Sequence, residues 1–274
     1  MQKTGIRNIE KRVPTQSVTI HPTAIIHPGA ELDEGVAVSP YSVIGENVKI
    51  GKGTKIGPHV VIEGVTTIDE DCVIYQFVSI GAPPQDMKFS GEMTEVIIGR
   101  RCVIREFVTI NKGTFLGKGK TILGSDNFIM AYAHIAHDCV IGDNVVMANS
   151  ATLGGHVEIE DHAIIGGLVP IHQFVKIGAY SMIGGGSTVT QDIPPFMTAV
   201  GNRARLYGLN SVGLKRHGFS PEDIKTLKMA YKIIFRSGMT LKKALDKVRT
   251  DVEPSRHIDH LVDFINASER GIIR

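Results

Sequence analysis

The sequence predicts a β-solenoid, in which short parallel strands and tight turns stack into coils, followed by a small helical domain. Aliphatic residues recur at every sixth position through most of the first 200 residues. Glycine or a small polar residue often follows the aliphatic residue, as in Ile44-Gly45. This period ends near Val200, where helical spacing begins. We therefore expect a solenoid domain over residues 1–200 and a helical domain over residues 201–274.

The six-residue period runs through three series of aliphatic positions, at residues 20–80, 98–116 and 123–189. Two irregularities interrupt it: a polar loop at about residues 82–95 and one additional residue before Leu123. A period of six fits neither an α-helix nor a long alternating strand. It fits a short strand and a turn with one aliphatic side chain pointing inward and glycine at the corner. Three sides of six residues give coils of 18, so the 27 aliphatic positions predict nine coils.

Composition supports this architecture and excludes several classes of protein. Hydrophobic residues make up 42% of the chain, but aromatic residues only 6%, and tryptophan is absent, so the core must consist of small and branched aliphatics. The net charge of +2 argues against disorder and against a uniformly basic nucleic-acid binder. No apolar run reaches the length of about 18 residues that a membrane-spanning helix needs. The polar segment Met1–Pro14 lacks the apolar centre of a secretory signal.

Three cysteines, Cys72, Cys102 and Cys139, are odd in number and widely spaced, with no C-x-x-C motif. This usage favours a reduced, cytoplasmic location.

Helical signals begin after the solenoid. Ser220-Pro221 is typical of a helix start, with a capping serine followed by proline in the first turn. We expect this helix to end at Gly238 and a second helix to run from Thr240 through Val248. A last helix is expected over residues 257–268.

A coil made of three hexads places polar residues that lie far apart in sequence on one vertical stripe. His137 follows its inward Ile135 by two positions, and His156 follows Leu153, one coil later, by three. The predicted stripe contains His134, His137, Asp138, Gly155, His156, His172 and Gln173. A single histidine on a solenoid is usually an outward polar residue or a corner. Four histidines on one stripe indicate a functional site.

Two chemistries fit such a stripe. A neutral histidine oriented by the adjacent Asp138 carboxylate can remove a hydroxyl proton as a general base. Alternatively, three stacked histidines could bind zinc, as in the hexapeptide-repeat carbonic anhydrases, which pair Gly-His with His-Gly-Cys. Here the second motif reads His137-Asp138-Cys139, and we favour the general base with no metal.

The hexads resemble the left-handed parallel β-helix of the hexapeptide-repeat acyltransferases. More specific segments resemble the UDP-N-acetylglucosamine O-acyltransferase family of lipid A biosynthesis, and the similarity covers nearly the whole chain from about Pro22. These segments are residues 74–77, 84–88, 135–139, 148–157, 171–174, 191–195, 213–216 and 270–274.

The resemblance implies roles for individual residues. His137 would be the general base for the sugar 3-hydroxyl, Asp138 would orient it, and the Gly155 N–H would stabilise the oxyanion. The substrates would be UDP-N-acetylglucosamine and an (R)-3-hydroxyacyl chain on acyl carrier protein, without a cofactor. The implied substrate-binding residues are Gln85, Asp86, Lys88, His134, His156, His172, Gln173, Asn210 and Arg216.

Two further positions relate to substrate choice and to a departure from the family. Gly185 matches the position where side-chain bulk sets acyl length, and glycine there implies a long chain, nearer fourteen carbons than ten. The family often has two arginines after the lysine, whereas here Lys215-Arg216 is followed by His217. This puts one phosphate or carrier contact in doubt.

The charge is unevenly distributed along the chain. Residues 201–274 contain 15 Lys or Arg and 8 Asp or Glu, whereas residues 1–200 contain 15 and 20. A net charge of +7 on the helical part suits an acidic partner, and the acyl carrier protein of the family is acidic. The family is a homotrimer with active sites between subunits.

Three rival functions explain the sequence less well. The N-acyltransferase of the same pathway normally has an N-terminal uridine-binding domain, for which the short segment before the first hexad at Ile20 leaves no room. A zinc carbonic anhydrase would contain metal. A scaffold without catalytic function would leave the clustered histidines unexplained. Nucleic acid fits poorly, because no basic groove with interleaved aromatics is visible.

Overall fold

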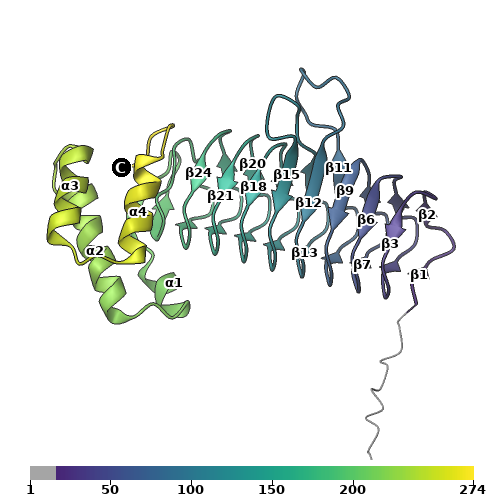
Figure 1. The fold of residues 1–274 in the computed structure, drawn as a ribbon, viewed down its shortest axis with the longest axis horizontal. Coiled ribbons are helices and arrows are strands. Elements are labelled where there is room, and N and C mark those ends of the chain that lie inside the picture. Colours follow the sequence, from purple (N-terminus) through teal and green to yellow (C-terminus); the bar gives the residue numbers. More distant parts are fainter. Residues whose placement is uncertain (1–16) are drawn as a thin grey trace, which may run out of the picture.

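The computed structural model describes residues 17–274 and is a long three-sided prism with helices at its C-terminal end (Figure 1). The polar segment Met1–Pro14 lies outside the described residues. Among residues 17–274, no helix is both long and apolar enough to cross a membrane.

Each side of the prism is one sheet of very short strands, and the chain passes through the first, second and third sheets in turn. The first sheet has eleven strands, of which the first nine in order are β1 (Thr19–Ile20), β4 (Ala37–Val38), β7 (Lys55–Ile56), β10 (Val73–Ile74), β13 (Val103–Ile104), β16 (Phe128–Ile129), β19 (Val146–Met147), β22 (Ile164–Ile165) and β25 (Met182–Ile183).

The second sheet has eight strands: β2 (Ile25–Ile26), β5 (Val43–Ile44), β8 (Val61–Ile62), β11 (Ser79–Ala82), β14 (Thr109–Asn111), β17 (His134–Ile135), β20 (Thr152–Leu153) and β23 (Pro170–Ile171). The third sheet also has eight: β3 (Glu31–Leu32), β6 (Val48–Ile50), β9 (Val65–Ile68), β12 (Glu95–Ile98), β15 (Lys120–Leu123), β18 (Val140–Ile141), β21 (Glu158–Ile159) and β24 (Lys176–Ile177). Parallel neighbours are one coil apart, as in the pair Ile135 and Leu153.

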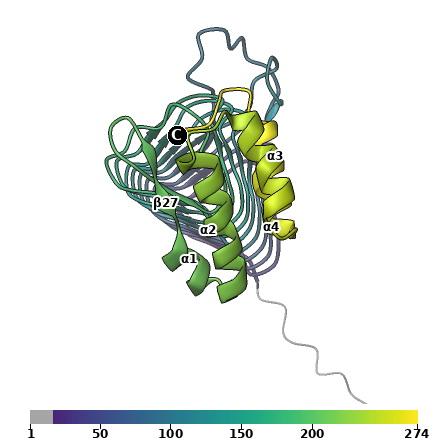
Figure 2. The same cartoon turned by 90° about the vertical axis from the view of Figure 1, so that its left-hand side faces the viewer.

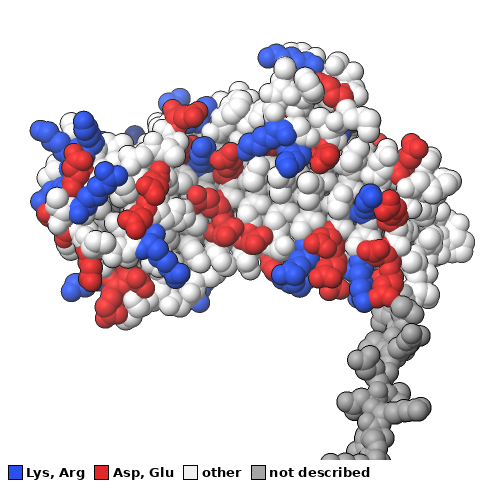
Figure 3. Space-filling view, viewed as in Figure 1, with Lys and Arg blue, Asp and Glu red and all other residues white. Residues whose placement is uncertain are grey.

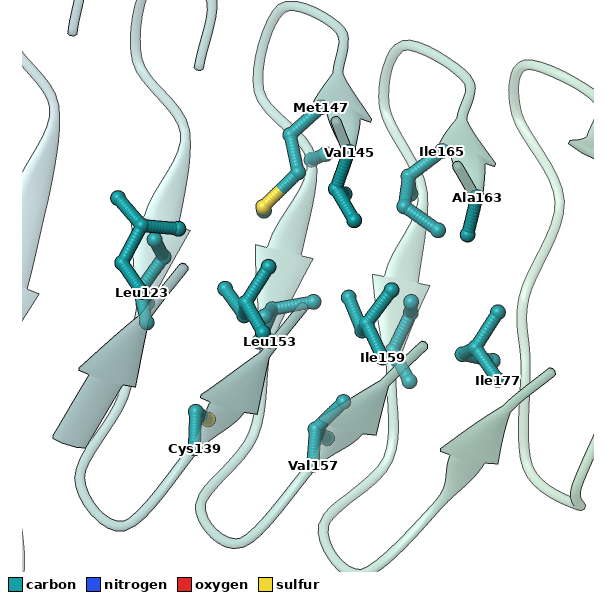
Figure 4. Close-up of a cluster of buried hydrophobic side chains, with 14 of the residues drawn as sticks. Leu123, Cys139, Val145, Met147, Leu153, Val157, Ile159, Ala163, Ile165 and Ile177 are labelled. Carbon is teal, nitrogen blue, oxygen red and sulfur yellow. The ribbon is translucent and has the colours of Figure 1, made fainter. Parts of the chain in front are cut away.

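The core is the column of aliphatic side chains inside the prism. Ile62, Ile135 and Ile165 are fully buried, and Figure 4 shows how such side chains from successive coils pack on one another. The predicted parallel β-helix with small C-terminal helices is confirmed by this topology. Figure 3 shows acidic and basic side chains scattered over one face of the molecule. Lys49 and Glu31, on neighbouring strands of the third sheet, form one such ion pair.

The prediction that Leu116 belongs to the inner aliphatic column, with one additional residue before Leu123, is wrong. Leu116 is 80% exposed and lies outside the inner column. Ile98 pairs directly with Leu123, whereas a coil of regular length would pair it with Leu116, and a loop at residues 112–119 accounts for the excess. This coil is longer than a regular coil by one hexad plus one residue. Leu116 therefore still falls on the six-residue period of the sequence, although the chain has left the prism there. The loop at residues 83–94 similarly separates Ile68 from its partner Ile98.

The solenoid closes with a hairpin that the sequence analysis did not anticipate. Strand β26 (Met197–Val200) joins the first sheet parallel to β25 and pairs antiparallel with β27 (Arg205–Leu209). The predicted domain boundary at residue 200 remains a prediction.

Four helices follow: α1 (Ser211–Arg216), α2 (Pro221–Arg236), α3 (Leu241–Asp251) and α4 (Arg256–Asn266). They lie across the end of the prism (Figure 2). The predicted capping serine is confirmed, since Ser220 and Asp223 form a capping box. The six-residue helix α1 was not predicted from the sequence.

The C-terminal residues return from α4 to the prism. Ile272 and Asp192 form an isolated parallel β-bridge, in which the Asp192 N–H donates to the Gly271 carbonyl oxygen at 3.0 Å. The Ser268 hydroxyl also donates to the Asp192 carboxylate at 2.6 Å. This tail therefore covers the last coil next to the predicted histidine stripe.

Candidate active site

The centre of the predicted stripe lies at the corner between the second and third sheets, which we call the catalytic corner. His137 and Asp138 follow β17, and His156 follows β20, one coil later. The φ angles of Asp138 and His156 are +60° and +62°. A left-handed backbone at each corner turns the chain sharply and brings side chains of neighbouring coils together.

His137 and Asp138 form a hydrogen-bonded pair, with 2.8 Å between Nδ1 and Oδ2. Asp138 is fully buried and the His137 side chain is 15% exposed. Asp138 also accepts hydrogen bonds from the Thr114 N–H, the Thr114 hydroxyl and the Lys118 N–H. Burial raises the pKa of Asp138, but hydrogen bonds from Thr114 and His137 outweigh it, so this pKa lies below its usual range. A charged carboxylate on Nδ1 assigns the proton to that nitrogen and leaves Nε2 as the acceptor.

Gly155 lies directly beside the imidazole of His137. A Cβ atom at this position would come within 2.6 Å of Cε1 and Nε2 of His137, which is closer than non-bonded carbon atoms approach. The Gly155 backbone therefore reaches the reactive edge of the base only because it carries no side chain.

Two further histidines surround the pair, both with a pKa lowered by burial. His156 stacks on Phe174 at 4.4 Å and meets His137 edge to face; burial lowers its pKa, opposed by the Asp138 carboxylate. His134 shares a 2.7 Å hydrogen bond with the Thr109 hydroxyl, and both burial and His137 lower its pKa. Neutral imidazoles suit hydrogen bonding to uncharged hydroxyl and amide groups.

The remaining predicted residues of the stripe lie farther along the same corner. His172 and Gln173 follow β23 and are exposed. The Arg270 guanidinium from the C-terminal tail lies 2.9 Å from His172 Nδ1 and donates to the Thr190 carbonyl oxygen. Arg270 was not predicted as a site residue, although residues 270–274 carry part of the family resemblance.

The loop at residues 83–94 starts from the catalytic corner and carries three predicted binding residues. Asp86 accepts a hydrogen bond from the Lys88 N–H at 3.0 Å, and Gln85 and Lys88 are exposed. Asp86 is near enough to His156 to favour its charged form.

Three predicted residues lie at other corners of the same chain. Asn210 is buried beside the corner between the third and first sheets, where it caps α1 and donates to the Tyr180 carbonyl oxygen. Arg216 ends α1 and is exposed. Gly185 follows β25 at the corner between the first and second sheets, where an added Cβ would lie 3.3 Å from the Gly167 carbonyl oxygen.

His217, the departure from the family pattern, follows α1 and is exposed, but its ring lies against aromatic residues of the solenoid. Its ring lies 4.9 Å from that of His162 and 5.2 Å from that of Tyr180. Burial and His162 lower its pKa.

A cleft of about 470 Å³ connects the catalytic corner to the C-terminal tail. Its lining residues are Lys118, His156, Glu158, Phe174, Lys176, Asp192, Glu269 and Arg270. Three cations and three anions face one another there, so the cleft suits a polar, charged substrate more than a purely apolar one.

One group of side chains has ligand atoms close enough to share a metal ion. Atoms of His137, Asp138 and His156 lie within 4.8 Å of one another. The Asp138 oxygens, however, already accept hydrogen bonds from Thr114, Lys118 and His137. This donor set holds an anion and orients a base, and it leaves the carboxylate poorly available as a metal ligand.

The family description "Udp N-acetylglucosamine O-acyltransferase; Domain 2" matches residues 192–273, and "Bacterial transferase hexapeptide (six repeats)" matches residues 120–155. A protein of Thermodesulfovibrio yellowstonii named acyl-(acyl-carrier-protein)–UDP-N-acetylglucosamine O-acyltransferase is 59% identical over 93% of this chain and 99% of its own length. A Janthinobacterium protein of the same name is 56% identical over the same shares.

Solved structures agree with the sequence relatives. The structure of LpxA from Acinetobacter baumannii is 44% identical in sequence to this chain and has a TM-score of 0.90. The match covers 93% of this chain and 99% of the Acinetobacter chain. The UDP-N-acetylglucosamine acyltransferase of Bacteroides fragilis is 43% identical with a TM-score of 0.91, covering 93% and 100%.

Proposed function

The chain belongs to the UDP-N-acetylglucosamine O-acyltransferase family, and we propose that His137 is the general base of its reaction. The enzyme transfers an acyl chain from acyl carrier protein to UDP-N-acetylglucosamine, the first step of lipid A biosynthesis. The observation that carries the proposal is the His137–Asp138 pair beside the Gly155 backbone.

Each step of transfer has a residue suited to it. His137 Nε2 removes the proton of the sugar 3-hydroxyl while the oxygen attacks the thioester carbonyl. Asp138 holds the ring and stabilises the imidazolium that forms. The Gly155 N–H stabilises the oxyanion of the tetrahedral intermediate. When the carbon–sulfur bond breaks, His137 returns the proton to the departing thiolate, so the base is restored.

We assign substrate binding to the predicted residues around the pair. His134, His156, His172 and Gln173 line the sugar and acyl positions, while Gln85, Asp86 and Lys88 reach the sugar and diphosphate from their loop. Asn210 and Arg216 hold uracil and phosphate, and Gly185 leaves room for a long (R)-3-hydroxyacyl chain. No cofactor takes part.

We further propose a homotrimer whose active sites lie between subunits. Asn210 and Arg216 lie at a different corner from His137, so a neighbouring copy must supply them if all three serve one site. A column of five stacked rings, at the corner between the first and second sheets, also favours association. Its members include Tyr41, 59% exposed, and Tyr132, 59% exposed.

Charge and cysteine chemistry support the proposed acyl donor and a cytoplasmic location. The helical part carries a net charge of +7, which would steer an acidic carrier protein toward it. All three cysteines are unpaired and buried, which supports a cytoplasmic enzyme.

The test is turnover of the purified enzyme with UDP-N-acetylglucosamine and carrier proteins bearing acyl chains of several lengths. His137→Ala should lower kcat by about 100-fold or more, since positioned bases contribute about 10²–10⁴. His27→Ala, at an exposed histidine in the first coils, serves as the matched control and should keep wild-type kcat. Substantial turnover by folded His137→Ala would refute the base assignment.

A further inference from the structure

We propose that Thr114 is a positioning residue of the catalytic pair, acting through Asp138. This inference rests on the proposed role of His137 and extends it to a loop outside the regular repeat.

The Thr114 contacts converge on a carboxylate with no access to water. Its hydroxyl donates to Asp138 Oδ2 at 2.7 Å, the same oxygen that His137 Nδ1 approaches at 2.8 Å. Its backbone N–H lies 3.1 Å from Oδ2 and 3.2 Å from Oδ1. The Lys118 N–H completes the set at 2.8 Å from Oδ1. Asp138 is fully buried, so these donors replace its hydration.

The loop at residues 112–119 has the shape that this contact requires. It leaves the prism after β14 and returns at β15, and it folds over the catalytic corner. An added Cβ at Gly117 would lie 2.4–2.5 Å from the carboxyl atoms of Asp138, so glycine is needed for the loop to close on the carboxylate. The regular hexads place Asp138 beside His137, but only the inserted loop supplies the donors.

The arrangement has a chemical consequence for the base. An anionic Asp138 keeps the Nδ1 proton on His137 and leaves Nε2 free to accept a proton. Without the Thr114 hydroxyl, Oδ2 loses a donor and the carboxylate becomes easier to protonate. A protonated Asp138 no longer orients the His137 ring or stabilises its imidazolium form. The hydroxyl thus extends the active range of the pair toward acid pH.

The experiment compares Thr114→Val, which removes only the hydroxyl at similar volume, with Thr114→Ser, which restores it. Thr94→Val is the matched control, because the Thr94 hydroxyl is also buried and donates to the neighbouring Gly113 carbonyl oxygen at 2.6 Å. We would measure kcat and KM from pH 5 to 9 with UDP-N-acetylglucosamine and the best acyl carrier protein substrate, together with thermal unfolding.

We expect Thr114→Val to lose about 10- to 100-fold in kcat, as for a hydrogen bond to a charged group, with KM little changed. Its acid limb should move to higher pH, while Thr114→Ser and Thr94→Val keep the wild-type limb.

Wild-type kcat and pH profile in Thr114→Val would overturn the proposal. Equal losses in Thr114→Val and Thr114→Ser at an unchanged acid limb would overturn it as well, because they indicate a packing role. If Thr114→Val did not fold, Thr114→Ala would replace it with the same criteria. Wild-type kcat in the His137→Ala variant would instead refute His137 as the base. A failure of the Thr114 proposal can therefore be distinguished from a failure of the proposed function.

Discussion

At the scale of single residues, close approach to His137 is the most demanding feature of the site. Gly155→Ala would place a methyl group within 2.6 Å of His137 Cε1 and Nε2, and the imidazole would have to rotate away. Because the pair must keep its geometry, we expect kcat to fall by about 100-fold or more, in line with displacement of a general base. Steady-state kinetics would measure this, with far-UV circular dichroism as the control for folding. Wild-type kcat in Gly155→Ala would contradict the geometry.

Residue positions were predictable where they obey the three-hexad period of the coils. His137, Asp138 and His156 were predicted to lie together because they occupy the same corner of two successive coils. In the structure His137 and Asp138 are hydrogen-bonded, and the rings of His137 and His156 meet edge to face. Thr114 and Arg270 were not found. They reach the corner from an inserted loop and from the tail, whose paths depend on three-dimensional packing. The roles proposed for Gly185 and for the binding residues remain predictions.

At the scale of elements, an ion pair connects α4 to the solenoid. His260 Nε2 lies 2.8 Å from the Glu160 carboxylate, which also accepts the Ala179 N–H. The hydrogen bond to Glu160 raises the pKa of His260, with Asp161 and Asp263 adding to it and burial opposing it. Because the pKa is higher in the folded state, the ion pair stabilises the fold. This contribution is fully present below the unfolded pKa of about 6.5 and is lost as pH rises through the folded pKa.

We therefore expect His260→Gln to lower the free energy of unfolding at pH 6 more than at pH 8. Both side chains are more than one-third exposed, so the pH-dependent part should stay below about 1 kcal/mol. Chemical denaturation at the two pH values gives the free energy of unfolding of wild type and variant. Other histidines change the stability of both proteins equally, so their contributions cancel in the difference between the two proteins. An equal loss at both pH values would show that the pair does not contribute through charge.

Element prediction succeeded for regular segments and failed where local and tertiary signals diverge. Helices α2, α3 and α4 were predicted from capping residues and apolar spacing, and each observed end differs from expectation by only a few residues. Strand β27 carries no such signal, and α1 has a capping Asn210 but is only six residues long. Both are held by contacts with the end of the solenoid. The loop at residues 112–119 was hidden because Leu116 still falls on the six-residue period, so the longer coil appeared in the sequence as only one additional residue before Leu123.

At the scale of the whole molecule, the proposed trimer makes a prediction about shared sites. In one chain, His137 lies at the catalytic corner, whereas Arg216 lies at the end of α1 beside another corner. If one site uses His137 of one subunit and Arg216 of its neighbour, two different inactive variants can complement each other. A single chain could not do so, because each variant would lack one essential group at every site.

We would unfold and refold His137→Ala and Arg216→Glu together at equal concentrations and compare the mixture with each variant treated alone. Random assembly gives an intact His137 next to an intact Arg216 at about one-quarter of the sites of a cyclic trimer, so activity should recover to about a quarter of wild type. Mass measurement in solution would verify the trimer. Recovery no greater than the sum of the separate variants, in verified mixed trimers, would place both residues in sites built from one chain. The exposed aromatic column would then serve association without completing the active site.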